Sequence, residues 1–535
     1  MKSTPLSLIA GTVALAAVTG FAALTAPGEA GAPEAKAAAR LPVERTSLLC
    51  PSPGGVELAE TTYTSVTPAG EGGGEAGTAE LSPAVPVTDD DAKDDGKKSD
   101  KEDKDGKGDK DGKGDKGDKG DKGDKGDKAD AKKGAKKEKP VVTLKESGKP
   151  VTAETSDEDA PALIGTATGR LAPGWAAQQT TVSPAGSARG LLGLSCGAPD
   201  TDFWFPGAST GKTRQDYIHL TNPDDSALVA DIELYGPEGP LASDIGDGIT
   251  VPGRSSVPLL LSTLTTDAVE DVTVHVTTRG GRIGAAIKVA EDEAGTDWLA
   301  ASTDPSGSLV LPGIPADATS VQLVAFAPGE EDADVKVQLL GKNAPFSPAG
   351  NDTLHIKSQM TASVDLKEVT GGEPGSVRLT PVGSGATPIV AALRVVRGSG
   401  DKQEIAYIPA TEPVGGRATV ADNRAKGSVL SLTAPAADAK VKVTTSAGSE
   451  GGEQAVKTYT VKAGTTLEVT PEVPSGLKGA YALTVETESG GPVHAARTLT
   501  VTEGGIKMFT VQTLPDDGGT VDVPRVTQDL SVLED

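Results

Sequence analysis

Two short motifs contain residues that could carry out chemistry. Residues 193–197 read GLSCG and match the G-x-S-x-G pattern of serine hydrolases, in which a strand, a sharp turn and a helix expose the serine as a nucleophile. Ser195 is followed instead by an Ala-Pro-Asp turn and an aromatic strand pattern. Residues 207–213 read GASTGKT and resemble a phosphate-binding loop, but Pro206 occupies the position of its first glycine and no helical pattern follows. We therefore expect a turn at each motif.

Histidines and acidic pairs are the other candidates for catalysis or metal binding. The four histidines fall in strand-like segments of three different modules, with no two at metal-ligand spacing; they are His219, His275, His355 and His494. Acid pairs such as Asp89 with Asp91 and Glu330 with Asp332 lie in predicted loops, and no pair can be assigned to the two sides of a glycosidase cleft. We expect no catalytic residues, no metal site and no cofactor.

The composition indicates an acidic, glycine-rich globular chain. The 535 residues include 67 glycines and 38 prolines, aromatic residues make up 3%, and the net charge is −25. A chain of this charge repels nucleic acid, so we expect no nucleic-acid partner. Two cysteines and four histidines are too few for a disulfide-dense miniprotein or a histidine-rich metalloenzyme.

The N-terminal segment predicts export. Lys2 precedes an uncharged apolar run over residues 6–24, and small residues and proline follow, which is typical of a Sec signal peptide. The run is also long enough for an uncleaved anchor, so we expect one or the other over residues 1–30. The sequence therefore predicts an extracellular or cell-envelope protein that contacts the membrane only if this segment is retained.

Export determines how the two cysteines are interpreted. Cys50 and Cys196 each end a short apolar segment, and an oxidising compartment favours a disulfide between them. Two free, buried thiols are the alternative.

A charged segment interrupts the first part of the chain. Residues 89–140 contain 18 lysines and 18 acidic residues, including five consecutive Gly-Asp-Lys triplets from Gly114. The triplets lack the proline that a collagen helix needs, and their aspartates lack EF-hand spacing. With almost no apolar side chain to bury, the segment is predicted to be a disordered insert.

Landmarks recur after residue 200 with a period of about 105 residues. A proline ends a short apolar run at Pro223, Pro328 and Pro435, and alternating strand patterns follow each. An Ala-Ala pair closes each copy, beginning at Ala285, Ala391 and Ala495. The period suits immunoglobulin-like sandwiches of about 100 residues.

We therefore predict an all-β chain of tandem immunoglobulin-like β-sandwich modules with a disordered charged insert. A divergent module that carries the disulfide and the insert precedes three others. Because each repeat has its own set of strands, residues 201–296 and residues 403–515 are each expected to fold when expressed alone. The predicted modules are residues 41–200, 201–296, 297–402 and 403–535, the last with a C-terminal strand and tail.

An aromatic triplet opens the second module. Trp204 aligns with aromatic residues of the later modules, so we expect all of them in sandwich cores; the others are Trp298, Tyr407 and Phe509. Phe203 and Phe205 point to the opposite face of the strand and are the candidate contact surface, unless an interface with the first module covers them.

These motifs resemble an uncharacterised family of exported actinobacterial proteins built from β-rich repeats. The resemblance rests on the Asn-Pro run, the V-P-x-x-S-x-x-x-L segment and the Ala-Ala strand, and on LLCPSPGG, APGWAAQQTT and RGLLGLSCGAPDTDFWFPGAS nearer the N-terminus. It covers most of residues 41–530. It implies export and association with the envelope, and no activity.

Together these features predict a non-catalytic, exported structural or adhesion protein of the cell envelope. Its expected partners are cell-wall polymers or envelope proteins. A cell-wall glycan- or peptidoglycan-binding accessory protein is the alternative. A secreted hydrolase is a further alternative, which the missing nucleophile–base–acid constellation disfavours.

Overall fold

The computed structural model describes residues 39–54, 58–70, 75–85, 139–186, 188–243 and 245–523. These residues form β-strands and three short 3-10 turns, with no α-helix among them. None of the described helical segments is long and apolar enough to cross a membrane. The predicted signal peptide or anchor lies outside the described residues, as does the predicted charged insert except for its last two residues.

The chain divides into two units. In the smaller one, β1 (Ala39–Pro42) pairs antiparallel with β36 (Thr520–Val523), and Arg40 Nε donates a hydrogen bond of 2.7 Å to Thr520 Oγ1. The larger unit, Val43–Gly519, contains four β-sandwiches of two antiparallel sheets each.

The strands of the four sandwiches follow one another along the chain. The first contains β2 (Arg45–Cys50), β3 (Glu60–Val66), β4 (Ala79–Pro83), β5 (Val142–Leu144), β6 (Val151–Thr155), β7 (Leu163–Thr168), β8 (Ala176–Ser183) and β9 (Gly190–Ser195), with the turn η1 (Gly169–Leu171). The second contains β10 (Asp202–Ala208), β11 (Arg214–Asn222), β12 (Leu228–Gly236), β13 (Gly239–Pro240), β14 (Ile249–Val251), β15 (Ser255–Leu260), β16 (Val272–Arg279), β17 (Gly284–Glu291) and β18 (Gly295–Leu299), with η2 (Leu261–Thr263).

The third sandwich contains β19 (Leu309–Ile314), β20 (Ala318–Phe326), β21 (Ala333–Leu340), β22 (Pro345–Phe346), β23 (Thr353–Ile356), β24 (Thr361–Lys367), β25 (Gly375–Pro381), β26 (Val390–Arg397) and β27 (Glu404–Pro409), with η3 (Gly400–Lys402). The fourth contains β28 (Ala418–Asn423), β29 (Ser428–Ala434), β30 (Ala439–Thr445), β31 (Ala455–Val461), β32 (Thr465–Val469), β33 (Tyr481–Gly490), β34 (His494–Glu503) and β35 (Ile506–Thr513).

Side-chain patterns explain which strands lie where. In β21 every second residue is apolar and buried, and Asp334 and Lys336 between them face solvent, as expected of a strand covered on one face. In β20 the last four residues, Leu-Val-Ala-Phe, are all buried. That strand is covered on both faces, because its second face packs on a neighbouring sandwich.

All four sandwiches share one strand order, so the predicted all-β sandwich modules are confirmed. In the fourth, one sheet runs β28-β33-β30-β31 and the other β32-β29-β34-β35, and the other three sandwiches repeat this order. The first and second strands of each sandwich lie in different sheets, whereas they share a sheet in an immunoglobulin domain. The modules are therefore sandwiches with a strand order different from the immunoglobulin one.

The aromatic strands close the sandwiches rather than open them. β18 pairs with β17 and β27 with β26, so the predicted boundary at 296/297 divides the last strand of the second sandwich, and the one at 402/403 separates the last strand of the third from its sheet. Trp204 lies on the first strand of the second sandwich and is not equivalent to Trp298. Sequence alignment paired these strands because both are short, aromatic and followed by small residues.

The flanks of the charged insert lie side by side. β4 and β5 form an antiparallel pair in which Ala79 is opposite Leu144 and Leu81 is opposite Val142. The insert therefore replaces the loop of a β-hairpin within the first sandwich.

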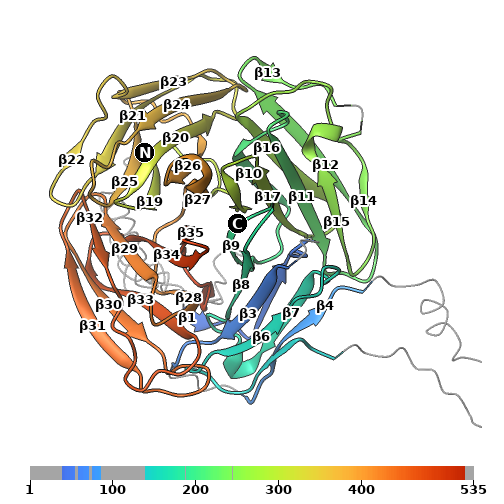
Figure 1. Cartoon of the computed structure of the whole chain (residues 1–535), viewed down its shortest axis with the longest axis vertical. Helices are drawn as coiled ribbons and strands as arrows, with labels where there is room; N and C mark the ends of the chain where they lie inside the picture. The colour runs from blue at the N-terminus through green and yellow to red at the C-terminus, as the bar shows by residue number, and fades with distance from the viewer. Residues whose placement is uncertain are drawn as a thin grey trace, which may run out of the picture. The chain divides into compact units, whose positions relative to one another are not determined.

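The sandwiches pack in a closed cycle within Val43–Gly519 (Figure 1). β10 contacts β20 and β26 of the third sandwich, β19 contacts β29 and β34 of the fourth, and β28 contacts β3 and β8 of the first. Leu49 on β2 completes the cycle against Gly284 at the start of β17. The last strands β9, β18, β27 and β35 also contact one another in turn.

Two sequence landmarks meet at these junctions. A Pro-Gly bulge bends the first strand at Gly207 and Gly313, whose φ angles of +95° and +92° favour glycine. A Cβ atom on Gly313 would lie 2.7 Å from the Cβ of Ala496, the second alanine of the repeated pair. The small size of Gly313 and Ala496 therefore allows β19 and β34 to approach each other closely.

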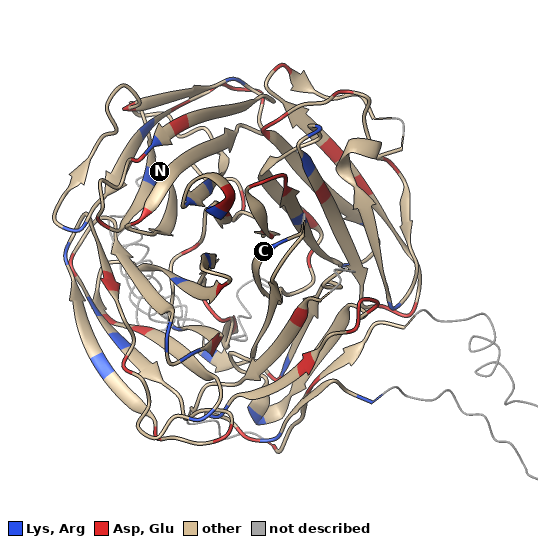
Figure 2. Ribbon diagram, in the orientation of Figure 1, with Lys and Arg blue, Asp and Glu red and all other residues tan. Residues whose placement is uncertain are grey.

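Charges are distributed over the whole larger unit. Figure 2 shows Asp and Glu interspersed with Lys and Arg over all four sandwiches.

Candidate functional site

A cavity of about 800 Å³ lies where the first, second and fourth sandwiches meet. The residues at and beyond the ends of three innermost strands line it: Cys196 after β9, Ala300 after β18 and Leu514 after β35. Its volume lies within the range of about 300–1,000 Å³ that is usual for small-molecule sites. Exposed lining residues such as Gly197 and Ala198 place its mouth at the surface.

Two buried polar side chains line this cavity. Gln178 on β8 is 1% exposed, and neither its Oε1 nor its Nε2 has a partner among the described residues. His219 on β11 is 4% exposed, its Nδ1 has no partner among those residues, and its ring meets the Trp298 ring edge-on at 5.2 Å. Buried polar atoms without partners are costly, which makes these two side chains the main candidates for binding a ligand.

Gln178 and His219 are larger than the side chains at the equivalent positions of the other sandwiches. The equivalent positions pair the second strand of each sandwich with its seventh: Thr64 with Gln178, His219 with Ala286, Val324 with Ala392, and Ser431 with Ala496. In the third and fourth sandwiches, the first strand of the preceding sandwich packs closely over this position. Larger polar side chains thus occur at the two positions that border the cavity.

Charged groups around the mouth differ in how they are paired. Asp517 accepts a hydrogen bond of 2.6 Å from Arg417 Nε, and Asp516 accepts one of 2.7 Å from the backbone N–H of Gly416. Arg45 and Arg282 also line the cavity, from the first and second sandwiches; both are exposed and neither has a partner within the described part of the chain. The unpaired charges at the mouth are therefore positive.

Ser195 and His219 line the same cavity, which raises the question of a hydrolase. A serine nucleophile needs a hydrogen-bonded histidine base that is itself oriented by a third group. The described residues contain no Ser195–His219 hydrogen bond, and His219 Nδ1 has no carboxylate partner there. Burial, together with the positive charge of nearby Lys288, lowers the pKa of His219 to about 3, so the ring is a poor base.

Because His219 is buried and uncharged, we expect the protein to lose stability in acid. The folded pKa of this histidine, about 3, lies below the unfolded value of about 6.5, so between these values only the unfolded chain takes up the proton. His219 should therefore lower the free energy of unfolding as pH falls from about 6.5 towards 3, by up to about 1.4 kcal/mol per pH unit. Urea unfolding at several pH values should show that the free energy of unfolding changes less with pH in His219→Phe than in the unaltered protein. The exposed His355 is the control, and an equal change in His355→Phe would contradict the assignment.

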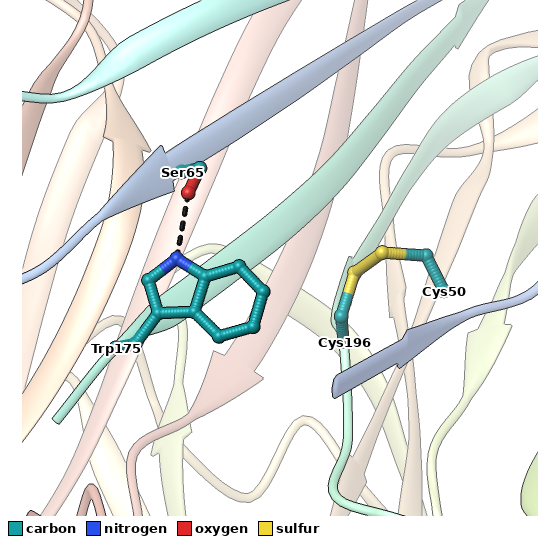
Figure 3. Close-up of a disulfide and its surroundings, with 4 residues drawn as sticks. All are labelled: Cys50, Ser65, Trp175 and Cys196. Carbon is teal, nitrogen blue, oxygen red and sulfur yellow. Dashed lines mark hydrogen bonds between the residues drawn. A yellow bond between two sulfur atoms is a disulfide. The ribbon is translucent and has the colours of Figure 1, made fainter. Parts of the chain in front are cut away.

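The predicted disulfide is present and joins the two sheets of the first sandwich (Figure 3). Cys50 ends β2, Cys196 follows β9, and their Cα atoms are 4.6 Å apart. Trp175 lies in the same core and donates a hydrogen bond of 2.8 Å from Nε1 to Ser65 Oγ. Cys196 also lines the cavity, so the bridge fixes one of its walls.

A buried carboxylate holds the four innermost strands together. Asp297 on β18 accepts hydrogen bonds from the backbone N–H groups of Gly193 on β9 and Tyr407 on β27, and from the Thr510 hydroxyl on β35 at 3.0 Å. Burial raises the pKa of Asp297 well above its usual value, against these hydrogen bonds, which lower it. Asp297 therefore stabilises the contact among the four innermost strands.

The predicted contact surface is only partly accessible. Phe205 is fully buried in the core of the second sandwich, which corrects its assignment as a contact residue. Phe203 is half-buried against the same core and lines the cavity. Trp204, expected in the core, packs instead on Phe326 of the third sandwich and stacks on His275 at 3.7 Å. The strand alternates as predicted, but its two faces were assigned the wrong way round.

The other predicted positions are dispersed. His275 contacts Glu233 and Asp202, His355 contacts Asp332 and Asp334, and His494 bonds the Thr411 carbonyl. No group of three or more potential metal ligands occurs in the part of the chain that the structure describes. Residues 207–213 form the end of β10 and the loop to β11, with no helix after them.

Sequence reasoning missed Gln178, Arg45 and Arg282 and gave His219 no role. An Ala-Ala pair also occurs at residues 176–177 in the first sandwich, but the strand register places Ala177 at the position of Ala285 and Gln178 at that of Ala286, so this pair is offset by one residue. Matching the Ala-Ala pairs by sequence would therefore have aligned Gln178 with Ile287 and Leu393 in place of Ala286 and Ala392, and the position of Gln178 follows only from the strand register.

Comparison with known proteins places the chain in a family without assigning an activity. No curated protein and no solved structure matches the chain. Residues 151–472, more than half of the chain and reaching from β6 into the fourth sandwich, match a family of unknown function, DUF5719. The chain therefore belongs to the family of unknown function DUF5719.

Proposed function

We propose that this protein is a non-catalytic, exported component of the cell envelope with a structural or adhesion role. The cyclic packing of the four sandwiches carries the proposal. Side chains of the third sandwich complete the core of the second, and side chains of the fourth complete the core of the third. Because whole junctions would have to break before one sandwich could move, the arrangement suits a rigid spacer or platform.

The disulfide supports export. Cys50 is fully buried and Cys196 is 6% exposed, and such a bridge persists in an oxidising compartment. The state of His219 supports the absence of hydrolase activity, since Ser195 has no base within the described residues that could activate it.

Fractionation of cells that produce the protein tests this proposal. We expect the full chain in the envelope or wall fraction, with the Cys50–Cys196 peptide pair recovered crosslinked on non-reducing mapping. Recovery in the cytoplasm with both thiols alkylated before reduction would refute it. Turnover in a broad hydrolase screen that is lost in Ser195→Ala would refute the non-catalytic assignment.

A second candidate function is binding of a cell-wall glycan. The observation that favours it is the cavity, whose two buried polar side chains have no protein partner among the described residues. Co-sedimentation of the purified protein with isolated wall polysaccharide tests this function, and a protein that stays in the supernatant would exclude it.

A further inference from the structure

We propose that the cavity among the first, second and fourth sandwiches binds an acidic saccharide. The inference deepens the glycan-binding function proposed above and rests on it. It names the residues that would hold the sugar and the charge that the sugar must carry.

Neutral polar groups line the inner part of the cavity. The low pKa of His219 keeps its imidazole uncharged, and Gln178 contributes an amide. An amide and a neutral imidazole each donate and accept hydrogen bonds, as a sugar hydroxyl does. A ligand that pairs with them removes the cost of leaving these buried atoms without partners.

The walls of the cavity are shaped for a compact ring. Small side chains such as Ala285, Ala300 and Ala301 leave space, and half-buried Phe203 supplies an aromatic ring beside them. An apolar ring next to hydrogen-bonding groups matches a sugar, which has one apolar face and a rim of hydroxyls.

The mouth of the cavity selects for a negative charge. Arg45 and Arg282 are unpaired among the described residues, whereas the nearby carboxylate of Asp517 is already bonded to Arg417. Guanidinium groups bind carboxylates through paired, charge-assisted hydrogen bonds. A sugar acid satisfies the arginines through its carboxylate and the buried side chains through its hydroxyls.

A peptide fits the cavity less well. Extended peptides usually bind by pairing with a free strand edge. Gln178 and His219 lie on β8 and β11, and both strands are interior in their sheets, with neighbours on either side. The polar groups that these strands offer are therefore side chains.

Calorimetric titration of the oxidised full chain tests the inference with three probes: trigalacturonic acid, neutral galactotriose and triglutamate. We expect trigalacturonic acid to bind about tenfold more tightly than galactotriose, with an affinity that falls as salt is added. The double variant Arg45→Gln/Arg282→Gln should bind the two sugars equally.

Neighbouring glutamines provide a matched pair of variants. Gln178→Leu should weaken both sugars by about tenfold, since a buried hydrogen-bonding group is lost. Gln179→Leu should change neither affinity, because Gln179 is equally buried and unpartnered among the described residues but does not line the cavity.

Three results would overturn the inference: no binding of either sugar, equal affinities of the unaltered protein for both sugars, or an equal loss in the two glutamine variants. Binding of triglutamate in place of the sugars would also overturn it and assign the cavity to a peptide. If the sugars fail to bind while the protein still sediments with wall polysaccharide, the glycan-binding function stands and only this site is rejected.

Discussion

A fragment that contains only the second sandwich, residues 202–299, should fail to unfold cooperatively. Its core shares one hydrophobic cluster with Ala392, Val396, Ile405 and Tyr407 of the third sandwich. Full burial of a large apolar side chain contributes about 1.5–3 kcal/mol, so losing these contacts costs about 6 kcal/mol. That loss is comparable with the whole stability of a typical domain, about 5–15 kcal/mol.

Thermal unfolding followed by near-UV circular dichroism measures this effect. We expect no sigmoidal transition for residues 202–299 and a single transition for residues 43–519. Residues 202–409 restore this junction but lack Ala496, Phe509 and Val511 of the fourth sandwich, so they should unfold cooperatively at a lower temperature than residues 43–519. A single sandwich that melts cooperatively near the temperature of the full chain would contradict the shared core. It would restore the expectation, drawn from the repeat alone, that each module folds independently.

Local patterns predicted the sandwiches because alternation and turn residues are local signals. The period-two pattern of β21 and the Ala-Ala pairs mark the strands and their repeat. Such a pattern does not say which strands pair. β29 pairs with β32 and β34, and nothing in the sequence of β29 distinguishes these partners from β28 or β33.

The cycle and its cavity were harder to predict, because they depend on contacts between distant segments. Strands buried on both faces, such as β20, indicate a second packing surface but not its partner. The disulfide was predictable since the sequence has two cysteines and the export predicted from its N-terminal segment favours pairing them. Gln178 was not predicted, because a glutamine next to Ala-Ala becomes unusual only once the sandwiches are superposed by register.

The alanine variant of Asp297 is expected to be the most destabilising single substitution on the innermost strands. The carboxylate accepts hydrogen bonds from the backbone N–H groups of Gly193, Trp298 and Tyr407 and from the Thr510 hydroxyl, all in a fully buried position. Each buried donor left without an acceptor costs about 1–3 kcal/mol, so the variant should lose about 4 kcal/mol or more.

The same carboxylate joins strands of all four sandwiches, so its loss should weaken the whole cycle rather than one module. Urea unfolding should show Asp297→Ala with a lower midpoint in one transition, and Asp297→Asn with a smaller loss, because the amide keeps one acceptor oxygen. Asp202→Ala is the control: its exposed contact with His275 should be worth less than about 1 kcal/mol. If Asp297→Ala were no less stable than Asp202→Ala, the four strands would be held by their apolar contacts alone, and Asp297 would be a tolerated charge in the core.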